Sequence, residues 1–102
     1  MRRIKLMTGL MLVLAAGSVA AQGADPHRGR SLAASCSSCH GTNGISQGAV
    51  PSLAGAAKAD LVAKMQEFKS GKRPGTIMPQ LAKGYSDEQI ETVAAWFAAQ
   101  KP

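Results

Sequence analysis

The feature that most limits how this chain can fold is the run Cys36-Ser37-Ser38-Cys39-His40. Two thiols separated by two residues, with a histidine directly after the second, form the pattern of covalent haem attachment. Thiols on one turn of backbone can add to the two vinyl groups on one edge of a porphyrin, and the next residue then lies under the iron. The chain has no other cysteine, so we expect one covalent haem, held by Cys36 and Cys39, with His40 as an iron ligand.

Three other uses of a Cys-x-x-Cys pair explain less of the sequence. A thioredoxin-like redox site needs a βαβ scaffold, and no strand pattern is visible here. A disulfide between Cys36 and Cys39 would close a very small loop and would leave His40 without a role. A zinc site lacks a second pair of ligands, because His27 alone does not complete a tetrahedron.

Residues 1–21 have the order of a secretory signal peptide, with basic residues first, then an apolar run, then small residues. We expect cleavage near Ala20 or Ala21, export to the periplasm, and one domain over residues 22–102. The alternative is a retained membrane anchor. The uncharged stretch over residues 6–21 is short for a span of about 20 apolar residues, so we expect no stable membrane span after cleavage.

The expected domain is small and weakly basic. Three of the 12 lysine and arginine residues precede residue 22 and none of the six acidic residues do, so the net charge falls from +6 to +3. No basic run is longer than Lys72-Arg73, so we expect an acidic protein surface as partner and no nucleic acid. Four aromatic residues make a thin core, which a buried haem would complete: Phe68, Tyr85, Trp96 and Phe97.

Two helices are predicted in the first part of the domain. Asp25-Pro26 has the character of an N-cap and a first-turn proline, and the helix that follows runs towards Cys36. A second helix is expected over about residues 58–70, because apolar residues recur there at helical spacing and Gly71 follows as a stop. Residues 41–56 are rich in glycine and serine, so they are expected to be a loop.

The last helix has the clearest sequence signals. Ser86 and Gln89 form a capping box, and apolar residues then recur at helical spacing as far as Phe97. Residues 72–85 carry two prolines and two glycines and are expected to be mostly loop. The predicted fold is therefore all-α, with three main helices wrapped around one haem.

A second iron ligand would make the haem an electron-transfer centre, whereas an open face would bind gases or peroxide. Met65 lies on the apolar stripe of the second helix, where packing explains it. His27 precedes Cys36 by about 13 Å along the same helix, so it is badly placed for the opposite haem face. Met78 lies in a predicted loop, far enough from His40 for the chain to wrap round the ring. We therefore expect Met78 to be the second ligand.

Together these features resemble the short bacterial class I cytochromes c. The resemblance rests on the haem-attachment run, Pro51-Ser52-Leu53-Ala54-Gly55, Met78-Pro79 and an aromatic residue in the final helix. It implies the class I cytochrome c fold and a hydrogen bond from the second ring nitrogen of His40 to the backbone carbonyl of Pro51. It also implies a close crossing of the first and last helices at Gly29 and Trp96.

A narrower resemblance lies in residues 68–78 and 82–86, which look like the single-haem cytochrome subunit of flavocytochrome c sulfide dehydrogenase. In that family the haem takes electrons that a flavoprotein partner removes from sulfide. The resemblance implies an electron-transfer protein that is not an enzyme on its own. Two other functions stay open: a diffusible carrier serving a terminal oxidase or reductase, and an open-site haem enzyme or gas sensor.

The charged residues suggest a docking face. Four basic residues flank the Met78 segment: Lys69, Lys72, Arg73 and Lys83. Three acidic residues cluster at the start of the last helix: Asp87, Glu88 and Glu91. We expect a positive rim near the exposed haem edge, with the acidic residues further away.

Overall fold

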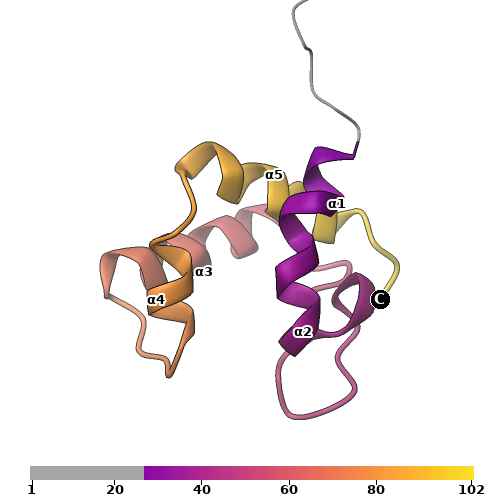
Figure 1. The fold of residues 1–102 in the computed structure, drawn as a ribbon, viewed down its shortest axis with the longest axis horizontal. Helices are drawn as coiled ribbons and strands as arrows, with labels where there is room; N and C mark the ends of the chain where they lie inside the picture. Colours follow the sequence, from indigo (N-terminus) through magenta and orange to yellow (C-terminus); the bar gives the residue numbers. More distant parts are fainter. Residues whose placement is uncertain (1–26) are drawn as a thin grey trace, which may run out of the picture.

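The computed structural model describes residues 27–102, which form short helices joined by loops (Figure 1). No strand is present within that range, and the all-α prediction is confirmed. None of the helices in the described part combines the length and the apolar character that a membrane crossing requires. The predicted signal peptide, its cleavage site and the Asp25-Pro26 cap lie outside the described residues.

The N-terminal helical segment reaches the two cysteines, as predicted, in three consecutive pieces. These pieces are α1 (Arg28–Ala33), the 3₁₀ turn η1 (Ala34–Cys36) and α2 (Ser37–His40). Gly41 ends α2 with a φ of 86°, and a side chain there would overlap the backbone of Ile45. The chain then passes through a second 3₁₀ turn, η2 (Thr42–Gly44), into the long loop before the next helix.

Three further helices form the rest of the domain. They are α3 (Lys58–Ser70), α4 (Met78–Ala82) and α5 (Asp87–Ala98). Gly71 ends α3 in the left-handed conformation, as its sequence position predicted. The capping box of α5 is confirmed: Gln89 N–H donates to Ser86 Oγ over 3.1 Å, and Ser86 N–H donates to Gln89 Oε1 over 2.9 Å.

Residues 72–85 are mostly loop, as predicted, except for the short helix α4, which the sequence did not predict. Pro79 is a typical loop residue in sequence, but it lies in the first turn of α4, where a missing N–H removes no helical hydrogen bond. The N–H groups of Gln80 and Leu81 each donate to Ile77 O over 3.0 Å. Ala82 is fully buried where α4 packs near α3. Tertiary contact therefore stabilises a helix that is too short to be stable by itself.

The helices meet around α5, against which both α1 and α3 pack, while α4 packs on α3. Figure 1 shows α5 along the top, with the α1–α2 segment on one side and α4 on the other. The predicted crossing is confirmed, because a Cβ on Gly29 would lie 3.0 Å from Trp96 Cβ. Among the described residues the largest fully buried side chains are Ile90 and Phe97, so the protein core is thin.

Candidate haem site

A cavity of about 620 Å³ lies between the N-terminal helical segment and the later helices. All five residues predicted for the site line it: Cys36, Cys39, His40, Pro51 and Met78. They come from η1 and α2, from the loop that precedes α3, and from the first residue of α4. The fold thus brings together side chains from three distant parts of the chain. The volume is within the range of cofactor pockets, roughly 300 to 1,000 Å³.

The lining of this cavity is largely apolar and is incompletely covered by protein. Val50 is 38% exposed, Ile77 is 56% exposed and Leu81 is 46% exposed, and all three line the cavity. Large apolar side chains left uncovered around one hollow indicate a binding surface for an apolar group. A haem fits this arrangement, because the same hollow also presents two thiols, an imidazole and a thioether.

The two cysteines lie one turn apart at the edge of the cavity. Both are free thiols in the structure; Cys36 is half-buried and Cys39 is exposed. Burial raises the pKa of the Cys36 thiol, and a hydrogen bond with Ser35 opposes this more weakly. Within residues 27–102, no group of three or more His, Cys, Asp or Glu side chains is placed to hold a metal ion. Attachment of a porphyrin edge is the chemistry that this pair of thiols offers.

The orientation of His40 is set by the backbone of the loop opposite. His40 Nδ1 lies 2.6 Å from the carbonyl oxygen of Pro51, so the hydrogen bond implied by the resemblance is present. A carbonyl oxygen can only accept, so Nδ1 carries the proton and Nε2 keeps its lone pair for a metal. The N–H groups of Leu53 and Ala54 both donate to Gly44 O, over 2.7 and 3.1 Å, which anchors this loop.

Gly44 itself has to be a glycine. Its φ is 78°, and a Cβ would lie 2.7 Å from Phe97 Cδ1 and 2.9 Å from Ala54 N. Gly44 thus lets the turn pack closely against α5, and its carbonyl anchors the loop that contains Pro51 beside His40.

Two methionines line the cavity. Met78 is half-buried at the start of α4, and Met65 is half-buried on α3. The prediction placed Met65 in the packing stripe of its helix, whereas the structure turns it towards the same hollow. His27 does not line the cavity. The ligand role of Met78 stays a prediction, with Met65 as its nearest rival.

Sequence reasoning missed a polar contact at the cavity wall. Ser35 Oγ and Tyr85 OH are 2.8 Å apart, and both residues line the cavity. Lys69 Nζ donates to the Tyr85 carbonyl over 2.7 Å and so holds the backbone beside this contact. No local pattern links residues 50 positions apart, so the sequence offered no signal for the pair.

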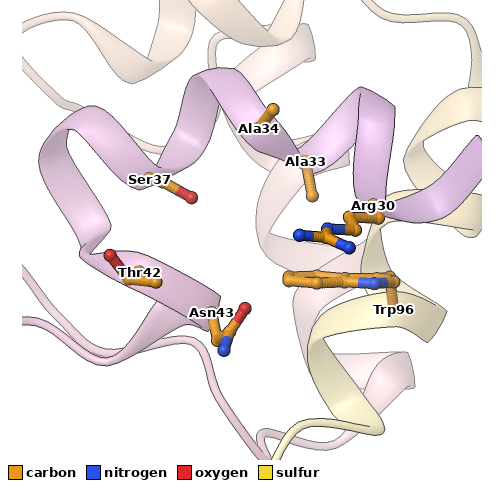
Figure 2. A pocket seen from close by; sticks show the side chains of 7 residues that line it. All are labelled: Arg30, Ala33, Ala34, Ser37, Thr42, Asn43 and Trp96. Atoms are coloured by element: carbon orange, nitrogen blue, oxygen red, sulfur yellow. The ribbon is translucent and has the colours of Figure 1, made fainter. Parts of the chain in front are cut away.

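A second, smaller pocket of about 280 Å³ lies on another face of the same N-terminal helical segment (Figure 2). Its lining residues are Arg30, Ala33, Ala34, Ser37, Thr42, Asn43 and Trp96. Figure 2 shows the Arg30 and Trp96 side chains together at one end and Thr42 and Asn43 nearer the other. It contains no thiol, imidazole or thioether, so the haem chemistry belongs to the larger cavity.

The predicted separation of basic and acidic residues is wrong in part. Lys69 Nζ lies 3.1 Å from Asp87 Oδ1, so an acidic residue from the start of α5 lies within the expected positive rim. Arg73 is paired with Glu67 over 2.7 Å. Lys72 and Lys83 form no ion pair within residues 27–102 and remain as the unpaired cations of the four. The long Lys69 side chain of α3 meets Asp87 of α5 at this point. The separation of the two residues along the sequence did not predict this contact.

An all-α domain whose Cys-x-x-Cys-His turn opens onto an apolar cavity is the architecture of a small c-type cytochrome. The model of the cytochrome c family matches residues 26–101, and the chain belongs to that family. Its cofactor is haem c, and its fold is that of the class I cytochromes c.

Three relatives show the range of this likeness. The cytochrome subunit of sulfide dehydrogenase from Chlorobaculum tepidum is 40% identical over 70 residues, which cover 69% of this chain and 64% of the relative. Cytochrome c4 from Pseudomonas aeruginosa is 37% identical over 98 residues, covering 95% of this chain and 49% of the relative. Cytochrome c-554(548) from Halomonas halodenitrificans is 31% identical over 81 residues, which cover 76% of this chain and 98% of the relative. This chain thus spans less than two thirds of the first two relatives.

Proposed function

We propose that this protein is a periplasmic electron-transfer protein whose single haem is held by Cys36 and Cys39 and ligated by His40 and Met78. Residues 1–21 are a signal peptide in this proposal, and residues 22–102 are the haem domain. The observation that carries it is the joint lining of one apolar cavity by these four side chains. The haem, when bound, supplies an iron that changes between the ferric and ferrous states.

The protein's own residues set the conditions for that change. Pro51 O holds the His40 ring in one orientation, so Nε2 would be the nitrogen that binds the haem iron. The Met78 thioether would be the second iron ligand, and a thioether raises the reduction potential of a haem. The apolar lining would limit the access of water to the bound group.

We further propose that the protein is the electron-accepting subunit of a flavin-dependent sulfide dehydrogenase. The support is the likeness to the Chlorobaculum tepidum subunit and the run over residues 68–86 that connects α3, α4 and α5. In this role the haem receives electrons from a flavoprotein partner, and the cytochrome carries out no substrate chemistry itself.

Co-purification tests this partner directly. The tagged protein is isolated from its native periplasm, and the eluate is examined for a flavin spectrum and for haem reduction on addition of sulfide. We expect a flavin in fixed ratio to haem and rapid reduction by sulfide. A Lys72→Glu, Lys83→Glu bait, which removes the unpaired cations beside the Met78 segment, provides a matched control for surface docking. Haem without flavin, and without a response to sulfide, would contradict the subunit role.

A diffusible carrier is the second candidate. Cytochrome c-554(548) is matched over 98% of its own length, so a cytochrome of about this size occurs among the relatives. A diffusible carrier would react with its partner in a bimolecular step whose rate depends on salt, whereas a fixed subunit would show little such dependence.

A further inference from the structure

Residues 71–77 join α3 to α4 and so decide where Met78 lies over the cavity. The consecutive residues from Arg73 to Met78 all line the cavity. Residues 74–77 are nevertheless exposed, so burial contributes little to holding this connection in place. Its position depends on particular contacts with the neighbouring helices.

The strongest of these contacts is made by Arg73. Its Nε and its Nη2 each lie 2.7 Å from Glu67 Oε2, and its backbone N–H donates to Glu67 O over 3.1 Å. Glu67 belongs to the last turn of α3, so both the backbone and the side chain of the connection are tied to that helix. Charge-assisted bonds from a planar guanidinium fix orientation as well as distance, which a lysine cannot reproduce.

Phe68 extends this contact towards Met78. The guanidinium carbon of Arg73 lies 5.7 Å from the centre of the Phe68 ring. A Cβ on Gly75 would lie 3.2 Å from Phe68 Cε1 and 3.1 Å from Pro79 Cδ, so Gly75 lies close against both. An unbroken series of contacts therefore runs from Arg73 through Phe68 and Gly75 to Pro79, which is bonded to Met78.

The other ion pairs of the described residues lie elsewhere. They are Arg28–Glu88, Lys58–Glu91 and Lys69–Asp87, and each joins α5 to another helix. The Glu67–Arg73 pair alone among these four ties the 71–77 connection to a helix.

We propose that the Glu67–Arg73 pair positions Met78, by holding the 71–77 connection against Phe68 so that the thioether stays over the cavity. The inference rests on the proposed role of Met78 as an iron ligand. Glu67 and Arg73 act through the connection and are positioning residues. Its consequence is kinetic: an external ligand binds the ferric iron when Met78 leaves, so the binding rate reports how firmly the connection is held.

The test measures imidazole binding to the ferric holoprotein by stopped-flow spectroscopy in four proteins. Glu67→Gln removes the charge, and Arg73→Lys keeps the charge but loses the planar fork. Glu91→Gln is the matched control, because it breaks an ion pair of similar exposure, between Lys58 and Glu91 at 3.0 Å, that does not touch the connection. We expect Glu67→Gln and Arg73→Lys to bind imidazole about tenfold faster than the parent, which is equivalent to a free-energy difference of about 1.4 kcal/mol. We expect the Glu91→Gln control to bind at the parent's rate.

Equal rates in all four proteins would overturn the proposal. A similar acceleration in Glu91→Gln would also overturn it, since that would indicate general loosening of the fold. If Arg73 acted on the acid groups of the haem, the variants would change the reduction potential and leave the imidazole rate at the parent value, which again contradicts positioning.

A second readout separates this inference from the ligand assignment on which it rests. Sulfur ligation gives ferric cytochromes a weak near-infrared charge-transfer band, and Met78→Ala should remove it. A parent without this band contradicts both the Met78 assignment and the positioning role. If the parent shows the band, but Glu67→Gln and Arg73→Lys bind imidazole at the parent's rate, only the positioning role is contradicted.

Discussion

A single hydrogen bond at His40 decides which ring nitrogen is available to a metal. Because Pro51 O accepts from Nδ1 over 2.6 Å, Nε2 is the nitrogen that a neutral ring leaves free to bind a metal. The thiols of Cys36 and Cys39 are placed by the same helical turn that ends at His40. At the scale of residues, the folded chain therefore holds the imidazole and the two thiols at one cavity.

Replacing both cysteines tests covalent attachment. The Cys36→Ala, Cys39→Ala protein should carry no covalent haem, because both thioether bonds are lost. A denaturing gel stained for haem peroxidase activity measures this, with Ser38→Ala as a control inside the same turn. Staining of the double variant would show that the haem is attached elsewhere. The unattached chain should also be largely unfolded by circular dichroism, since its protein core is thin.

Replacing Met78 tests the second ligand. Met78→Ala should leave the haem attached, allow the ferrous protein to bind carbon monoxide, and lower the reduction potential, because a thioether favours ferrous iron. Met65→Ala is the matched control, since that methionine lines the same cavity on α3. The assignment fails if Met65→Ala opens the iron and Met78→Ala does not.

At the element scale, one carboxylate of α5 makes two hydrogen bonds to α3. Asp87, in the first turn of α5, accepts hydrogen bonds from Gln66 over 2.9 Å and from Lys69 over 3.1 Å, both on α3. These bonds, the one from Gln66 foremost, lower the pKa of Asp87, and the charge of Lys69 adds to the effect. The helix dipole favours the same charge at this position.

The pH dependence of this junction follows from the direction of that shift. A carboxyl whose pKa is lowered by folding stabilises the protein above its unfolded pKa, about 3.9, and this contribution is lost as the pH falls through the lower folded value. Asp87→Asn should therefore unfold at lower urea concentration than the parent at pH 7, and the difference should shrink in acid. Asp60→Asn, in the first turn of α3, controls for the helix dipole. A difference that stays constant between neutral and acid pH would contradict this account.

The whole molecule combines a thin protein core with a large apolar hollow. Within residues 27–102, Ile90 and Phe97 are the largest fully buried side chains, and exposed apolar side chains remain around the cavity. A chain of this size buries little surface by itself, so the bound haem completes the core as well as providing the function. The stability of the domain and the binding of haem therefore depend on the same contacts.

Partner docking is tested at this scale through Lys72 and Lys83, the two cations of the predicted rim that form no ion pair within residues 27–102. Lys72→Glu with Lys83→Glu should slow bimolecular electron transfer to the partner at low salt, and much less at high salt, where the Debye length falls below about 8 Å. Arg30→Glu, at the second pocket, changes the charge on another face and serves as the control (Figure 2). Equal rates for the double variant and the parent at low ionic strength would exclude this docking face.

Sequence alone determined the features that depend on a few neighbouring residues. The helical turn before Gly41, the Ser86–Gln89 capping box and the Gly71 helix stop were predictable because their hydrogen bonds or special backbone angles arise within one or two turns of chain. The family resemblance supplied the Pro51 hydrogen bond and the Gly29–Trp96 crossing, which no local pattern would have indicated.

Tertiary structure decided the features whose partners are distant along the chain or depend on packing. The prolines and glycines of residues 72–85 favoured a loop, yet packing against α3 stabilises α4 and places Pro79 where its missing N–H costs nothing. The Lys69–Asp87 contact and the turning of Met65 towards the cavity likewise depend on how α3 lies against α5 and α4. Such contacts arise from the relative placement of helices, which spacing along a single sequence does not encode.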